Sequence, residues 1–433
     1  MLPMPFMMFM LLLLLLFLNI PVYISLFLVS ILFGFILWGE QSLHIVFNAI
    51  WSTMNNWGLV SLPLFVLMSA LMEECKLADE MFRAFNNWIG GIRGALLIVA
   101  TLLGFTIGAM SGVVAAGVVT LAFLVYPQMM KYNYPKKLSI GALIAAGSLP
   151  QLVPPSLNMI VYGILTGVSI GKLFAGGLGM SIVMTALFII YILIWCQLNK
   201  DKVPITKERV SLKEKFLSLK GLIGPLAIIF GTLGTIFTGI ATPTEAAGVG
   251  AFLTLIYAAI RRRLTKDALM KSLLTTLKVT SMACWIVAGA VAFGSIFSGV
   301  GGRRAIIELL LSLPQARITA VIAALALIFF LGMFIETVSI ASIIGPILAP
   351  VMEALGYDPV WWGTIFCTIL MTAFLTPPVG MSMYYFKASR PEVTMEEIYK
   401  AVWPFVGLQV LTTALGIIFP EIPLFFVRLF FRG

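Results

Sequence analysis

The sequence predicts an all-α polytopic membrane protein built as an inverted repeat, in which each half carries a re-entrant helical hairpin and a broken helix. Of its 433 residues, 61% are hydrophobic and 11% are charged, whereas soluble domains average about 25% charged residues. Two Pro-Pro pairs, Pro154-Pro155 and Pro377-Pro378, interrupt hydrophobic stretches long enough to cross a bilayer. Because proline removes a backbone donor and clashes with the preceding turn, a helix cannot run unbroken through either pair.

The two halves share landmarks at a nearly constant offset in sequence number. The offset between the two Pro-Pro pairs is 223, and offsets between 222 and 224 recur in five further matches: Tyr134 with Tyr357, Tyr162 with Tyr385, Pro135 with Pro359, Gly108 with Gly332, and Pro21 with Pro243. One such match is weak, but the whole set indicates a duplication. Broken helices at corresponding places in two halves are typical of secondary transporters, whose sites lie at the breaks.

Hydrophobic stretches and their interruptions define the expected elements. In the first half we expect spans near 3–18, 21–39 and 58–74, an amphipathic segment at 76–94, a long apolar stretch at 95–126, a broken span at 138–163 and a plain span at 173–197. In the second half we expect spans near 221–240, 243–260 and 279–299, an amphipathic segment at 303–315, a long apolar stretch at 318–352, a broken span at 361–385 and a final span at 402–427. The first segment lacks the basic flank of a cleavable signal peptide, so we interpret it as a retained span.

The stretches at 95–126 and 318–352 are too long for one perpendicular span. At about 1.5 Å per residue, a helix of either length overshoots a ~30 Å hydrocarbon core. Glycine-containing breaks, GAMSG (108–112) and GMFIET (332–337), lie midway and favour two half-length helices that form a re-entrant hairpin. Irregular backbone at such depth needs protein or a water-filled cavity around it. A single kinked, tilted helix is the alternative.

Basic residues orient the predicted spans. Lys and Arg cluster after the first hairpin (131–137), in the loop between the halves (200–220) and after the span at 243–260 (261–271), and the positive-inside rule places all three clusters in the cytoplasm. Segment 353–362 has acids and no base, so we expect it outside. The hairpins then enter from opposite faces and both termini lie outside, although Arg428 and Arg432 oppose this placement of the C-terminus. We therefore interpret the net charge of +10 as topology determinants and lipid-headgroup contacts, and not as a sign of nucleic-acid binding.

The amphipathic segments at 76–94 and 303–315 precede the two hairpins at equivalent places. Such helices can lie along the membrane and join a fixed scaffold to a moving core. We therefore expect five parts: scaffold spans and an arm helix at 1–94, a transport half at 95–197, a cytoplasmic loop at 198–220, further scaffold spans and a second arm helix at 221–315, and a second transport half at 316–433.

Other chemistries find little support in the sequence. The four cysteines are scattered without a CxxC pair, and the single histidine, His44, lies in a short segment that we expect at the membrane interface. A membrane enzyme would need a nucleophile with its base, or a metal cluster. A proton relay would need more acids within the spans than Glu245 and Glu336. The sequence therefore predicts a transporter that is not an enzyme and has no covalent cofactor.

The helix breaks offer neutral ligands for a metal cation. C-terminal ends of half-helices direct carbonyl groups towards a cation, and N-terminal ends direct N–H groups towards an anion. The breaks also carry hydroxyl groups at Ser111, Ser148, Ser156, Thr337 and Thr376 and amides at Gln151 and Asn158. As substrate contacts we predict Ser148, Gln151, Asn158, Glu336 and Thr337.

Several of these residues have an alternative structural role. Thr242 and Glu245 around Pro243 show the pattern of a helix-capping box. Glu336 could cap the second half of its hairpin. Ser111 and Ser148 could be small residues that ease helix packing.

Five motifs resemble the large membrane subunit of a tripartite ATP-independent periplasmic (TRAP) transporter: SLPLFVLMSALME (61–73), GSLPQLVPPSLNMIVYG (147–163), ATPTEAAGVGAF (241–252), GMFIETVSIASIIGPILAP (332–350) and LTPPVGMSMYYF (375–386). The resemblance covers nearly the whole chain. It implies the ion-transporter superfamily fold, an elevator motion, and Na⁺-driven uptake of C4-dicarboxylates, sialic acid or other sugar acids across a bacterial or archaeal cytoplasmic membrane. It also implies two partners, an extracytoplasmic binding protein and a small four-helix membrane subunit. A self-sufficient secondary carrier or antiporter of the same superfamily is the alternative.

The resemblance also places two Na⁺ sites. The first joins the tip of the first hairpin to the first broken helix, at Ser111, Pro150, Val153 and Pro155. The second joins the tip of the second hairpin to the second broken helix, at Gly332, Ala373, Thr376 and Val379. The chain departs from the family pattern at or beside these sites: a serine becomes Val113, an aspartate becomes Gly117, and two glycines become Pro150 and Ala373. Carbonyl ligands survive such changes, whereas the hydroxyl at 113 is lost.

Overall fold

A computed structural model describes residues 3–431 except 19, 76–77, 205–210 and 312–315, and this part of the chain is helical with no strand. Lys76, Lys207, Arg209 and the end of the second amphipathic segment lie outside the described residues. Within the described part, nine helical segments are long and apolar enough to cross a membrane. The chain is therefore a multi-pass membrane protein.

The N-terminal region contains one helix more than expected. It runs through α1 (Pro3–Phe17), α2 (Val22–Trp38), α3 (Ser42–Met54) and α4 (Ser61–Glu74). Helix α3 occupies the segment around His44 that we expected to be a short interfacial stretch. Its small and apolar residues Val46 and Ala49 are buried against Ala292 of α16, so tertiary packing stabilises a helix that local composition did not indicate.

The first long apolar stretch is a re-entrant hairpin, as predicted. After the amphipathic α5 (Ala78–Ile89), it forms α6 (Ala95–Ser111) and α7 (Val114–Leu124), with a turn at Gly112, where φ is +62°. Both arms lie against α9 (Lys136–Ser148): an added Cβ on Gly104 would collide with the carbonyl of Ala146, and one on Gly117 would lie 2.7 Å from the carbonyl oxygen of Gly147. One kinked helix could not bring both positions to the same place.

The first broken helix follows the expected course. Helix α9 ends in a 3-10 turn at Leu149–Gln151, the chain then leaves helical geometry through the Pro-Pro pair, and α10 (Leu157–Thr166) resumes. A short helix, α8 (Tyr126–Lys131), connects the hairpin to α9. Helix α11 (Ile170–Leu198) closes the first half.

The second half repeats this order with one fusion. Helices α12 (Leu212–Ser218), α13 (Lys220–Ile229), α14 (Thr235–Phe237) and α15 (Pro243–Ile260) lead to α16 (Lys266–Gly299) and the amphipathic α17 (Gly302–Leu311). Helix α16 begins at Lys266, well before the predicted span at 279–299. At the offset of 223, its range corresponds to α3 and α4 together, because the second half lacks the Asn55-Asn56 interruption that separates those two helices.

The second hairpin and broken helix also match the prediction. The hairpin comprises α18 (Ala316–Gly332) and α19 (Thr337–Ala354). The broken helix comprises α20 (Pro359–Ile369), a 3-10 turn at Leu370–Phe374 and α21 (Met381–Ser389).

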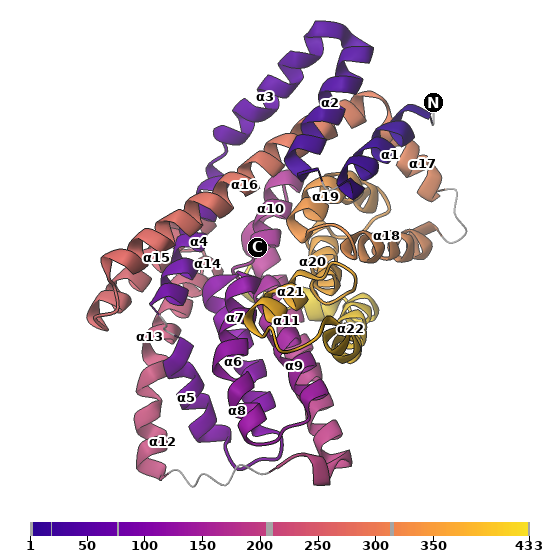
Figure 1. Ribbon diagram of the computed structural model, residues 1–433. Coiled ribbons are helices and arrows are strands. Elements are labelled where there is room, and N and C mark those ends of the chain that lie inside the picture. The colour runs from indigo at the N-terminus through magenta and orange to yellow at the C-terminus, as the bar shows by residue number, and fades with distance from the viewer. Residues whose placement is uncertain (1–2, 19, 76–77, 205–210, 312–315, 432–433) are drawn as a thin grey trace.

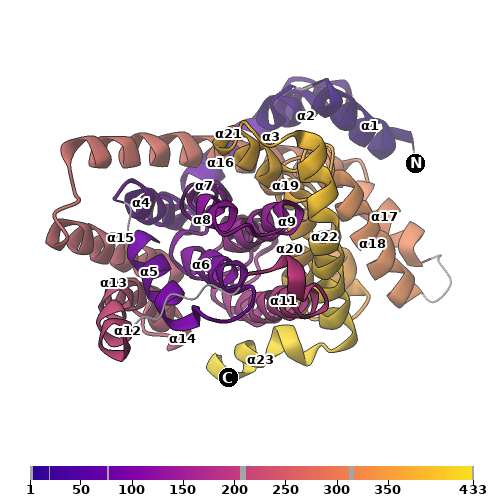
Figure 2. The same cartoon turned by 60° about the horizontal axis from the view of Figure 1, so that its bottom comes forward.

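The predicted final span at 402–427 is wrong in its extent. The chain forms α22 (Met395–Ile418) and a separate α23 (Glu421–Phe430). Phe419 adopts φ −119° and ψ 80° before Pro420, which ends the helix. Helix α23 then folds back along α11, where a Cβ on Gly179 would lie 2.6 Å from the carbonyl oxygen of Ile422 (Figure 2).

Two groups of helices share the molecule. Helices α2, α3, α4, α15 and α16 pack on one another, with α16 running obliquely across the others (Figure 1). A second group contains α6, α7, α9, α10, α11, α19, α20 and α22. Helices α8 and α12 both lie towards the bottom of the molecule in Figure 1, whereas α17 lies towards the opposite end.

Candidate functional site

The tip of the first hairpin touches the break of the first broken helix. An added Cβ on Gly108 would lie 2.9 Å from both Pro150 Cα and Val153 Cβ, and one on Gly112 would collide with the carbonyl of Pro155. Ser111 lies between these two glycines and is buried, as are Pro150, Val153 and Pro155. The structure thus brings the first predicted set of four residues into one buried cluster.

The second hairpin meets the second broken helix in the same way. An added Cβ on Gly332 would lie 2.8 Å from the Cβ of Ala373. The backbone N–H of Val379 donates to the carbonyl of Met333 at 3.2 Å, which ties the tip to the far side of the Pro-Pro pair. Thr376 is fully buried there. Gly332, Ala373, Thr376 and Val379 are therefore also brought together.

The prolines free particular carbonyl groups at both clusters. Pro154 stands four positions after Pro150, and Pro377 stands four positions after Ala373. Because proline has no N–H, the carbonyls of Pro150 and Ala373 cannot accept the usual helical hydrogen bond. Both residues contact a glycine near the C-terminal end of a hairpin helix, and helix ends of this kind carry carbonyl groups that can bind a cation.

Two departures from the family pattern lie face to face. An added Cβ on Gly117 would lie 3.0 Å from Pro150 Cγ as well as 2.7 Å from the carbonyl oxygen of Gly147. A carboxylate side chain at 117 has no room beside this ring. The ring of Pro150 therefore occupies the space beside residue 117, where the family pattern has an aspartate side chain.

Several side chains at the breaks form hydrogen bonds with backbone groups two to four residues away. The hydroxyl of Thr376 donates to the carbonyl of Thr372 at 2.5 Å, and that of Ser148 donates to Ala145 at 2.8 Å. Their oxygen lone pairs remain able to accept or to ligate. The hydroxyl of Ser111 accepts from the N–H of Val113 at 3.3 Å.

The capping alternatives for two acids are confirmed. Glu336 accepts from the N–H groups of Val338 at 3.1 Å and Ser339 at 3.2 Å, and also from the hydroxyls of Thr337 and Ser339. Glu245 and Thr242 form a reciprocal capping box at the start of α15. Both acids thus have a structural role at a helix start, and contact of Glu336 or Thr337 with a substrate stays a prediction.

Two predicted substrate residues have polar atoms without partners. Gln151 is 5% exposed and Asn158 is fully buried. The amide nitrogen of Gln151 and both amide atoms of Asn158 have no hydrogen-bond partner among the described residues. Because a buried amide without a partner costs free energy, these groups are available to a ligand or to bound water at the first break.

Sequence reasoning missed a third buried amide, Gln409 of α22. It is fully buried, and neither of its side-chain amide atoms has a partner within the described part of the chain. The available signal was a polar residue inside a predicted span, which is costly in a membrane unless it is used.

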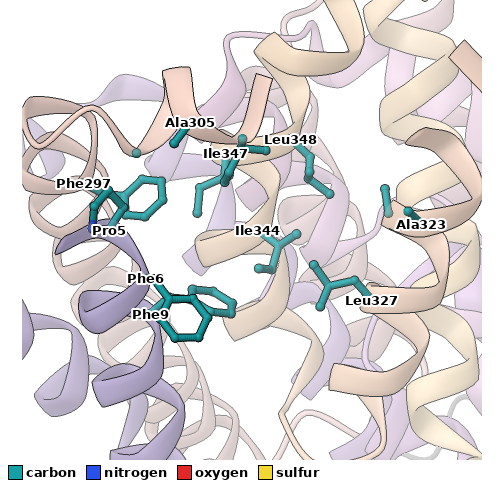
Figure 3. A pocket seen from close by; sticks show the side chains of 13 residues that line it. Pro5, Phe6, Phe9, Phe297, Ala305, Ala323, Leu327, Ile344, Ile347 and Leu348 are labelled. Carbon is teal, nitrogen blue, oxygen red and sulfur yellow. The ribbon is translucent and has the colours of Figure 1, made fainter. Parts of the chain in front are cut away.

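An apolar pocket of about 280 Å³ lies between α1, the end of α16 and the second hairpin. It is bordered by Phe6 and Phe9 of α1, Phe297 of α16 and Leu327 of α18 (Figure 3). All of its lining side chains are apolar, so it offers nothing to an ion or an acid.

Comparison with known proteins points to one family. Residues 9–422 match the family model of the tripartite ATP-independent periplasmic transporter, DctM component. The chain is 30% identical over 420 residues to the ectoine TRAP transporter large permease protein TeaC of Halomonas elongata, covering 96% of this chain and 97% of that protein. It is also 30% identical over 419 residues to the C4-dicarboxylate TRAP transporter large permease protein DctM of Vibrio cholerae, covering 91% and 90%. In fold it resembles the Alcanivorax borkumensis YdaH transporter, with a TM-score of 0.64, 15% identity, and coverage of 92% of this chain and 97% of the other.

Proposed function

The chain belongs to the DctM component family of tripartite ATP-independent periplasmic transporters, and we propose that it is the membrane subunit through which an organic anion enters a bacterial or archaeal cell on a Na⁺ gradient. The observation that carries the proposal is the pair of equivalent contacts between hairpin tips and helix breaks. In both contacts, a residue whose carbonyl lacks its helical donor lies against a glycine near the end of a hairpin helix. Broken helices of this kind form the ion and substrate sites of secondary transporters.

Neutral oxygen donors support Na⁺ as the coupling ion. At the first cluster, Ser111 and the carbonyls of Pro150, Val153 and Pro155 would hold one ion. At the second, Thr376 and the carbonyls of Gly332, Ala373 and Val379 would hold another. When bound, Na⁺ would draw each tip onto its broken helix, so that ion binding and substrate binding are linked.

The substrate is proposed to be an organic anion. One relative is named for C4-dicarboxylates, which agrees with the predicted class, and another is named for ectoine, which lies outside the predicted substrates. Gln151 and Asn158, with their unpartnered amides, are the residues best placed to contact the substrate near the first break.

The tripartite family description supports two partners. We propose that an extracytoplasmic binding protein delivers the substrate and that a small four-helix membrane subunit holds the scaffold. The helices of the second group would move as an elevator against the first group, with α5 and α17 as arms.

Reconstitution tests this assignment. The large subunit is placed in proteoliposomes alone, with the small subunit, and with both the small subunit and the binding protein. Uptake of the radiolabelled ligand of that binding protein is then measured under an inward Na⁺ gradient. We expect uptake only with all three proteins. Equal uptake by the large subunit alone would instead establish a self-sufficient carrier.

A further inference from the structure

A cavity of about 350 Å³ separates the two groups of helices near one end of the molecule. It lies between α16 and α19, close to the end of α10, and Arg303 of α17 borders it. Ser295, Ser298 and Ser342 add hydroxyl groups to its wall. Its volume falls within the range of about 300–1,000 Å³ that small-molecule sites occupy.

The cavity lies at the end of the molecule that the charge pattern places outside the cell. Helix α16 begins after the basic turn at 261–263 and ends at Gly299, directly before α17. Helix α17 lies opposite the end that carries α8 and α12 (Figure 1). A binding protein would release its substrate on this side.

An inverted counterpart of this cavity exists and is nearly closed. A pocket of about 20 Å³ lies between α4 and the arms of the first hairpin, and Ser111 borders it. At the offset of 223, its residues Met72 and Thr120 correspond to Ser295 and Ile343 of the larger cavity. The same interface is therefore open at one end of the molecule and shut at the other, as alternating access requires.

The charges at the two ends also differ. Arg303 is exposed and has no ion-pair partner among the described residues, since Glu308 pairs with Arg304. Its counterpart at the same offset is Glu80, whose carboxylate lies 2.5 Å from Arg261 and 3.7 Å from Arg263. The carboxylate at the counterpart position is thus ion-paired, and the charged residue that borders the closed pocket is an acid, Glu73. The guanidinium at the open end is available to a ligand.

We propose that the larger cavity is the outward vestibule and that Arg303 holds the carboxylate of the incoming substrate. A guanidinium can bind a carboxylate through two parallel hydrogen bonds, and the hydroxyl of Ser298 lies on the same wall. The neighbouring pocket of Figure 3 shares Phe297 and Ile347 but has only apolar side chains, so it cannot serve this purpose. The identity of the substrate as a carboxylate rests on the proposed function. The positive charge of the cavity does not, because it comes from Arg303 itself.

The first experiment measures the charge directly and needs no substrate. Ser298→Cys is introduced after the four native cysteines are replaced, and its reaction rates with an anionic and a cationic methanethiosulfonate are compared in the purified protein. We expect the ratio of anionic to cationic rates to fall severalfold when Arg303→Gln is added, because the local positive potential is lost. Arg304→Gln, the neighbouring ion-paired arginine, is the matched control and should leave the ratio unchanged. An unchanged ratio in Arg303→Gln would overturn the proposal.

The second experiment measures transport by the three-protein system. Arg303→Gln should raise the KM for uptake about tenfold or more, as expected for the loss of a charge-assisted hydrogen bond, and Arg303→Lys should recover part of it. Arg304→Gln should transport like the wild type. Wild-type uptake together with an unchanged KM in Arg303→Gln would refute the vestibule assignment alone, whereas absence of wild-type uptake would refute the proposed function.

Discussion

Gly332 at the tip of the second hairpin lies directly against Ala373 in the second broken helix, where an added Cβ would come within 2.8 Å of the alanine Cβ. Gly108 and Pro150 make the corresponding contact in the first half, at the positions that the repeat pairs with Gly332 and Ala373. In both halves the contacted residue is the one whose carbonyl is freed by the following Pro-Pro pair. Close approach at this point therefore sets the geometry of both proposed ion sites.

Gly332→Val should separate the tip from the broken helix. The added side chain overlaps Ala373, so we expect a loss of stability of about 1–3 kcal/mol and loss of Na⁺-dependent stabilisation. Melting temperature with and without Na⁺ measures both effects. Gly407→Ala is the control, because no atom lies within 4 Å of its added Cβ. If Na⁺ stabilised Gly332→Val as much as the wild type, the hairpin tip would not be part of the ion site.

Thr376→Val keeps the shape of the side chain and removes a proposed ligand. The loss of one buried polar partner should weaken Na⁺ binding by on the order of 1–3 kcal/mol, seen as a higher Na⁺ concentration at half-maximal uptake. Thr368→Val is the matched control, because Thr368 is also fully buried and its hydroxyl donates to Thr364 at 2.7 Å, away from the break. Equal Na⁺ dependence in both variants would mean that Thr376 only packs.

Gly117→Asp tests the match between position 117 and Pro150. The new side chain meets Pro150 Cγ and the carbonyl of Gly147, so we expect lower stability than in the wild type. Pro150→Gly made in the same protein should relieve part of this loss, with a coupling free energy of about 0.5–3 kcal/mol. Denaturation of the two single variants and the double variant gives the coupling. Strictly additive effects would show that the two positions are independent.

Crosslinking tests the division into scaffold and transport parts. Trp285 of α16 is 49% exposed and borders a groove of about 600 Å³ between α16 and the α3–α4 region, while Trp403 of α22 is 51% exposed. We expect cysteines on the small subunit to trap Trp285→Cys without stopping uptake, and not to trap Trp403→Cys. Efficient trapping at 403 would show that scaffold and elevator are reversed.

The sequence predicted the helix boundaries well where glycine or proline interrupts a hydrophobic stretch. The hairpins and the broken helices follow from such local signals at Gly112, Gly332 and the two Pro-Pro pairs. The capping box at the start of α15 follows from Thr242, Pro243 and Glu245. The sequence did not reveal α3, whose helix depends on burial of Val46 and Ala49 against α16. The prediction also missed the division between α22 and α23, although Pro420 was a local signal for a helix end. The packing of α23 along α11 depends on tertiary contacts and could not be predicted.

The candidate site was predicted in part. The motif positions identified the two sets of proposed ion ligands, and the structure brings each set together. The facing of Gly117 and Pro150, the unpartnered amide of Gln409 and the cavity beside Arg303 could not be predicted, because each depends on which helices meet in space.

The most direct test of the proposed Na⁺ coupling uses the three-protein system in proteoliposomes under imposed gradients. With an inward Na⁺ gradient and equal pH on both sides, uptake of the ligand of the binding protein should proceed, and it should stop when K⁺ replaces Na⁺. A pH gradient without Na⁺ should give no uptake. Full uptake on the pH gradient alone would contradict Na⁺ coupling at the two hairpin tips.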